Sequence, residues 1–131
     1  MNKKIYFLLR ISMLMYIASC FMPCLLTTSE KIYGFMCLLA GGISIISDIW
    51  LFLIWCSNIL YFYIVISLCK NKNIQIILPV LLLIAAVSML FHNYLEYDIQ
   101  VSIVKYLAGY YMWGVSYLIV LLSCIFKRKK Q

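Results

Sequence analysis

Charged residues are scarce in this chain, and acidic residues most of all. Of the 131 residues, 11% are charged, four are Asp or Glu, and one is His. A soluble domain of ordinary composition has about 25% charged residues. A metal site needs several converging ligands, and acid–base or nucleophilic catalysis needs paired side chains. We therefore predict no metal, no cofactor and no enzymatic activity.

Apolar residues, by contrast, are abundant. They make up 66% of the chain, and a globule of this size cannot bury so much apolar surface, so lipid is the predicted solvent. The net charge of +7 comes from basic residues at the ends of apolar runs rather than along one solvated face, which argues against nucleic acid as a partner. Alternating strand patterns are absent, so the spanning elements are predicted to be helices.

The second of four apolar regions is too long for a single ordinary crossing. It contains 38 residues with Asp48 as its one charge, and as a helix it would extend roughly 57 Å. A bilayer core is about 30 Å thick and needs about 17 to 25 helical residues, the length of each of the other three regions. The four regions are residues 5–26, 32–69, 74–91 and 106–126.

The basic residues indicate how the second region crosses. Lys and Arg in short loops are retained on the cytoplasmic side. One crossing places 9 of the 11 basic residues on that side, whereas two crossings divide them between the sides. The prediction is an all-α polytopic protein, a single bundle over residues 1–131 with both termini cytoplasmic. Its four transmembrane helices are predicted at about residues 5–26, 50–69, 74–91 and 106–126.

Residues 33–47 remain as a short outer-leaflet segment. Fifteen residues make about 22 Å of helix, which is short for a crossing. Gly41 and Gly42 are the predicted bend, because glycine accepts backbone angles that other residues resist. The segment either lies in the interface or re-enters the membrane, and the sequence leaves both paths open.

The cysteines invite two further interpretations. Lys3 and Lys4, an apolar stretch and the residues before Cys20 resemble a bacterial lipoprotein signal in which Cys20 is lipidated. Arg10 interrupts that stretch, and apolar residues continue after Cys20, so an uncleaved first helix is preferred and lipidation stays the alternative. A disulfide-forming oxidoreductase is disfavoured, because Cys20 and Cys24 do not form a Cys-x-x-Cys pair.

Three polar residues inside the apolar regions are candidates for a functional site. Asp48 either caps the start of a helix by accepting backbone hydrogen bonds or serves as a proton or cation relay. Asn58 is predicted near mid-membrane, where such residues more often join helices than bind substrate. Arg10 is expected to extend its guanidinium to the cytoplasmic phosphate layer.

The predicted outer loops carry a second group of candidates. His92 and Glu96 are four residues apart and Asp98 is near, so we predict a solvated contact surface in the outer loop rather than a metal site. The aromatic residues near the predicted span ends are expected to form an interfacial belt. They include Tyr61, Tyr106, Tyr110 and Trp113.

Several short motifs resemble a group of small four-span bacterial inner-membrane proteins of unknown role. They are Phe21-Met22-Pro23, Tyr33-Gly34-Phe35 followed by Gly41, Trp55-Cys56-Ser57-Asn58, and Gly109-Tyr110-Tyr111-Met112-Trp113 followed by Ser116. The resemblance covers most of the chain and implies location in the bacterial inner (plasma) membrane, with no particular activity.

The main expectation is a non-enzymatic membrane protein that acts through protein–protein interaction. Its partners are the lipid bilayer and either another membrane protein or further copies of itself, and a bacteriocin-immunity protein would have this size and these basic termini. The alternative is a small transporter or channel component in which Asp48 and Asn58 line a polar path.

Overall fold

Three long apolar stretches form helices, which satisfy their own backbone hydrogen bonds. The computed structural model describes residues 3–46, 48–92 and 102–128. The three helices are α1 (Lys3–Phe21), α3 (Ile49–Cys69) and α5 (Ala108–Arg128), and each is long and apolar enough to cross a membrane. The second apolar region thus holds one helix of spanning length, as predicted.

The fourth predicted span is a shorter helix, α4 (Ile77–Met89). It has 13 residues, about 20 Å of helix, against the predicted 74–91. Pro79 lies in its first turn, where a missing N–H costs least. Length and composition therefore support three spans among the described residues, and α4 is an apolar helix below that length.

A small sheet at one end of the bundle corrects the all-α prediction. Strands β1 (Pro23–Thr27), β2 (Lys31–Tyr33) and β3 (Ile103–Tyr106) pair antiparallel in the order β2-β1-β3. The predicted first span, 5–26, was wrong at its end, because α1 stops at Phe21 and β1 follows. Leu25 of β1 pairs with Ile32 on one side and Tyr106 on the other.

The predicted outer-leaflet segment is a short helix followed by a turn. Helix α2 (Gly34–Ala40) ends at the glycine pair, and the 3₁₀ turn η1 (Ile43–Ile45) follows. Both glycines keep right-handed helical angles, with φ −62° at Gly41 and −66° at Gly42, so the unusual backbone angles predicted for a bend are not observed. Close packing explains the need for glycine: a Cβ on Gly41 would lie 2.4 Å from Cδ1 of Trp55.

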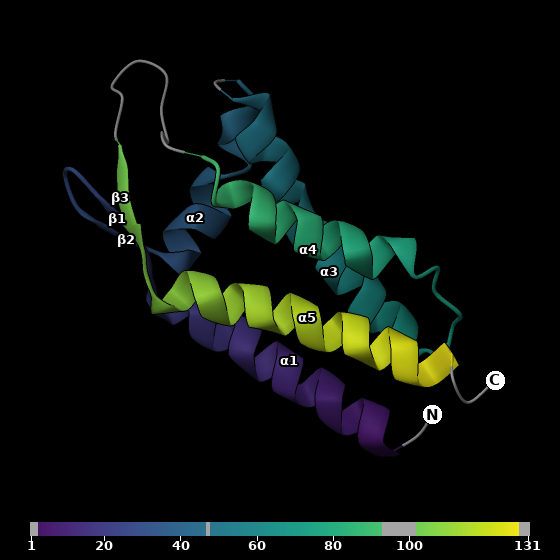
Figure 1. Ribbon diagram of the computed structural model, residues 1–131. Coiled ribbons are helices and arrows are strands. Elements are labelled where there is room, and N and C mark those ends of the chain that lie inside the picture. The colour runs from purple at the N-terminus through teal and green to yellow at the C-terminus, as the bar shows by residue number, and fades with distance from the viewer. Residues whose placement is uncertain (1–2, 47, 93–101, 129–131) are drawn as a thin grey trace.

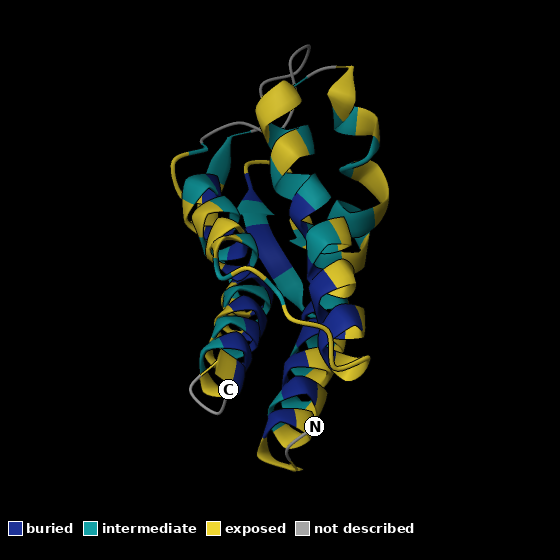
Figure 2. Cartoon of the chain, turned by 90° about the vertical axis from the view of Figure 1, so that its right-hand side faces the viewer, coloured by how far each residue is buried: buried dark blue, intermediate teal, exposed yellow. Residues whose placement is uncertain are grey.

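The helices pack in neighbouring pairs. Helix α1 packs most extensively on α5, and α4 packs on both α3 and α5. Buried positions lie along the facing sides of the helices and in β1 (Figure 2). The largest fully buried side chains include Leu9, Tyr61, Leu82 and Tyr117.

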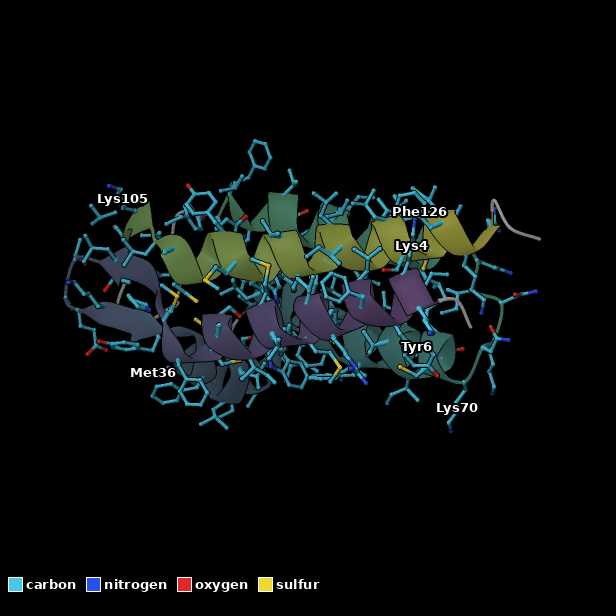
Figure 3. The ribbon with its side chains drawn as sticks, turned by 90° about the horizontal axis from the view of Figure 1, so that it is seen from below. Lys4, Tyr6, Met36, Lys70, Lys105 and Phe126 are labelled. Atoms are coloured by element: carbon cyan, nitrogen blue, oxygen red, sulfur yellow. The ribbon has the colours of Figure 1, made fainter. Side chains whose placement is uncertain are left out.

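The two ends of the bundle differ in structure. Figure 1 shows the start of α1, the end of α5 and the α3–α4 connection at one end, with the sheet and α2 at the other. In Figure 3, Lys4, Lys70 and Phe126 lie toward the first end, and Met36 and Lys105 toward the second. We call these the basic end and the sheet end.

Candidate functional site

Asn58 is the centre of a hydrogen-bond network inside the bundle. Its Oδ1 accepts hydrogen bonds from the Tyr16 hydroxyl at 2.9 Å, Nε1 of Trp113 at 3.1 Å and the Tyr117 hydroxyl at 3.1 Å. Its Nδ2 donates to the Trp55 carbonyl at 2.9 Å. One amide side chain on α3 therefore binds both α1 and α5, as predicted for a residue that joins helices.

A second set of hydrogen bonds lies next to Asn58. The Ser12 hydroxyl donates to the Ser116 carbonyl at 2.8 Å, so Tyr61, whose hydroxyl is 2.9 Å from Ser12 Oγ, is the donor in that pair. The Tyr61 ring stacks on Tyr16 with centroids 4.6 Å apart and on Tyr117 at 5.4 Å. Within the described residues, no buried side-chain nitrogen or oxygen lacks a hydrogen-bond partner.

These aromatic residues correct the predicted interfacial belt. Tyr61 has no exposed surface, Tyr110 is buried, and Trp113 packs against the core. The Tyr110 hydroxyl donates to the Ala86 carbonyl near the end of α4. At least Tyr61 and Tyr110 pack against other helices instead of facing lipid.

A cavity of about 330 Å³ lies between this network and the sheet end, with Asn58 among its lining residues. Small-molecule pockets are typically about 300 to 1,000 Å³, so this one is at the lower limit. Its walls are mainly apolar and include the rings of Tyr16, Trp55, Tyr110 and Trp113. Trp55 also donates to the Leu38 carbonyl at 2.8 Å, which fixes α2 against α3.

Three cysteines, from α1, β1 and α2, line the same cavity. They are Cys20, Cys24 and Cys37, all free thiols. Burial raises the pKa of Cys37 to about 11 and that of Cys24 to about 12. Both thiols are therefore protonated near neutral pH and are weak nucleophiles. The described part of the chain brings together no three His, Cys, Asp or Glu side chains in a metal-binding group.

Asp48 caps α3, which confirms the capping interpretation. Its Oδ1 accepts from the backbone N–H groups of Trp50 at 2.8 Å and Leu51 at 3.4 Å. The remaining oxygen, Oδ2, lies 2.8 Å from Nε2 of His92. Burial alone would raise the pKa of Asp48, but the hydrogen bonds from His92, Trp50 and Leu51 outweigh it and hold the pKa below its ordinary value.

His92 therefore connects the end of α4 to the start of α3. The Tyr106 hydroxyl donates to the His92 carbonyl at 3.0 Å and also to the Met89 carbonyl. The predicted topology already placed His92 and Asp48 on the same, outer side of the membrane. That shared location was the one sequence signal for their pairing. The other members of the predicted outer-loop surface, Glu96 and Asp98, lie outside the described residues.

The structure does not join the three predicted polar residues into one site. Asp48 and Asn58 are ten positions apart on α3, about 15 Å, and share no hydrogen-bond partner among the described residues. Arg10 is exposed on α1. Sequence reasoning missed Tyr16, Trp113 and Tyr117, since apolar spacing alone does not reveal which hydroxyl or indole N–H reaches an amide on another helix.

Comparisons with protein-family models, curated proteins and solved structures find no match for the chain. The similarity to small four-span bacterial proteins consequently stays a prediction. Any functional conclusion has to be argued from the residues and geometry described above.

Proposed function

We propose that this chain is a non-enzymatic protein of the bacterial inner membrane, with four spans and cytoplasmic termini, that acts through protein–protein interaction. Three helices of spanning length support membrane insertion. The proposed fourth span is α4, which runs from the basic end to the sheet end beside α3 and α5 (Figure 1). Backbone hydrogen bonds continue past Met89, from the N–H groups of Leu90, Phe91 and His92, and add almost a turn.

Orientation follows from the same arrangement. Lys3, Lys4, Lys70, Lys72 and Arg128 belong to the termini and the α3–α4 connection at the basic end. Because Lys and Arg near span ends are retained in the cytoplasm, this end is the proposed cytoplasmic side.

The interaction proposal depends on one observation. The segment from α2 to the start of α3 exposes apolar side chains, which disfavours water, and has a broken helical backbone, which disfavours lipid. Ile46, Leu39 and Ile43 are 87%, 74% and 68% exposed, so contact with water is costly. Helix α2 has seven residues and η1 three, with turns around them. Irregular backbone is not tolerated in contact with hydrocarbon. A protein surface satisfies both the apolar side chains and the backbone.

Site-specific photocrosslinking tests this proposal. A photoreactive phenylalanine analogue at Ile46 is expected to give a discrete protein adduct in intact cells. The same analogue at Leu14, which is 66% exposed on α1, is the matched control and is expected to label lipid. Equal protein adducts at both positions, or none at Ile46, would contradict the proposal. An adduct of twice the chain mass would identify self-association.

The proposed subtype is an immunity protein that binds a pore-forming toxin. It is supported by small size, basic termini and an apolar outer surface. Expression in a sensitive strain is expected to protect against a toxin encoded beside the gene. Absence of protection against all such toxins would remove this subtype but not the interaction itself.

A second candidate function is transport, which the 330 Å³ cavity reaching Asn58 favours. The sequence-based version uses Asp48 as well, and Asp48→Asn is then expected to lower proton or cation flux in proteoliposomes. Asp48 is engaged with His92 and the start of α3, so the geometry supports Asn58 more than Asp48. Unchanged flux in Asp48→Asn would exclude the carboxylate from a transport path.

A further inference from the structure

A second cavity, of about 200 Å³, lies at the basic end between the end of α3, the α3–α4 connection and the end of α5. Its apolar lining comes from Leu68, Ile74 and Cys124, and its polar lining from Asn73, Gln75, Lys127 and Arg128. The lining therefore combines two cationic side chains with two amides. Such donors are suited to a compact anion.

Lys127 is the most informative residue of this cavity, because it is 8% exposed although it is charged. Its Nζ donates to the Lys72 carbonyl at 2.6 Å, and that carbonyl is a neutral group. Buried lysines are rare unless they are paired with an opposite charge. One hydrogen bond leaves two ammonium N–H groups for another acceptor.

The Lys72 carbonyl is held in place by the turn that ends α3. Asn71 has a φ of 57°, and the N–H groups of Asn71 and Lys72 donate to the carbonyls of Leu68 at 3.0 Å and Ser67 at 2.9 Å. This is a Schellman turn, in which a left-handed residue ends the helix. Lys127 is thus anchored to a fixed backbone group rather than to a mobile loop side chain.

Nothing acidic among the described residues compensates for this charge locally. The described acids are Glu30, in the β1–β2 turn, and Asp48, at the start of α3, and both belong to the sheet end. Arg128 lies beside Lys127, and Lys70 and Lys72 follow α3 at the same end. The basic end therefore has a strongly positive potential next to a preformed cavity.

We infer that this cavity binds the phosphate of an anionic phospholipid headgroup. Basic pockets between transmembrane helices on the cytoplasmic side are suited to such headgroups. The phosphate accepts hydrogen bonds from Lys127 and Arg128. The partly exposed side chain of Ile74 then contacts the glycerol and first methylene groups, which free phosphate lacks.

The test is thermal unfolding of the full chain in a neutral detergent with added phosphatidylglycerol or phosphatidylcholine. Phosphatidylglycerol is expected to raise the unfolding temperature of the natural chain, and phosphatidylcholine is not. Lys127→Gln and Arg128→Gln are each expected to weaken apparent lipid affinity about fivefold. Lys105→Gln, at the exposed sheet end, is the matched control and is expected to bind as the natural chain does.

Three results would overturn the inference. They are no stabilisation of the natural chain by phosphatidylglycerol, equal losses in Lys105→Gln and Lys127→Gln, and full competition by inorganic phosphate, which would identify a site for the free ion. If Lys127→Gln does not fold, Arg128→Gln decides the outcome, because Arg128 is exposed and its replacement leaves the packing intact. This test is independent of the proposed protein–protein interaction.

Discussion

At the scale of single residues, the Asn58 side chain makes four hydrogen bonds at the point where α1, α3 and α5 meet. Its Oδ1 accepts three hydrogen bonds that come from α1 and α5. In hydrocarbon these donors have no water to replace a lost acceptor. The network therefore specifies how the three helices meet, in addition to stabilising them.

Asn58→Leu keeps a similar volume but removes the shared acceptor. Interhelical hydrogen bonds in membranes are worth about 0.6 kcal/mol each, so losing three is expected to lower the free energy of unfolding by about 2 kcal/mol. Titration with a denaturing detergent measures this value. Ser88→Ala is the matched control, because Ser88 donates within its own helix, to Ile84. Equal losses in the two variants would refute the role assigned to Asn58.

Asp48 links the residue scale to the element scale, since one carboxylate holds the start of α3 and the end of α4. Its folded pKa is below the ordinary value of 3.8. The stabilisation is consequently present above that value and is lost as the pH falls through the folded pKa. The unfolding temperature of the natural chain is expected to fall below about pH 3.8 more steeply than that of Asp48→Asn.

The comparison separates the carboxylate from the cap. Asn is a good N-cap residue, so Asp48→Asn keeps α3 capped and loses the ionisable partner of His92. Asp48→Ala loses the cap as well and is expected to cost about 1 kcal/mol more at neutral pH. Parallel pH profiles for the natural chain and Asp48→Asn would show that the ionised carboxylate of Asp48 adds no stability beyond what Asn provides.

At the scale of elements, the sheet and α5 meet through Gly109. A Cβ there would lie 2.7 Å from Sγ of Cys24 and 2.9 Å from the Met22 and Pro23 carbonyls. Most of these atoms are backbone, which cannot move aside cheaply. The start of α5 therefore requires glycine for close approach to β1.

Gly109→Ala is expected to lower the free energy of unfolding by about 1 to 3 kcal/mol, because the added methyl overpacks the contact with β1. Gly114→Ala, on the same helix, has nothing within 4 Å of the added Cβ and is expected to be neutral or to stabilise by up to about 1 kcal/mol. Thermal unfolding of the two variants compares them directly. Similar effects at both positions would mean that helix propensity, and not the contact with β1, decides the result.

At the scale of the whole molecule, the bundle has a basic end and a sheet end. Single cysteines in a cysteine-free chain are expected to follow this division. An impermeant maleimide applied to intact cells is expected to label Ser29→Cys and Lys105→Cys, and not Asn71→Cys, because Asn71 lies at the proposed cytoplasmic end. Labelling of Asn71→Cys with protection of Ser29→Cys would reverse the orientation. Labelling of all three would refute insertion across the membrane.

The apolar pattern determined much of this architecture. The length of the second apolar region excluded a single helix over all of residues 32–69. The spanning helix in it, α3 (Ile49–Cys69), lies almost where predicted. Asp48 was identifiable as a helix start, because capping is a local property. These features depend on residues near one another in the chain.

Only the tertiary structure decided which distant residues meet. Leu25 became part of a strand because Tyr106, far along the chain, supplies its second partner. Tyr61 is buried, although a tyrosine suits a membrane interface equally well. His92 lies 44 positions from Asp48 in the sequence and still forms a hydrogen bond with it. Such contacts depend on how helices rotate and dock, and lipid-exposed and buried faces of an apolar helix have nearly the same composition, so hydropathy cannot distinguish them.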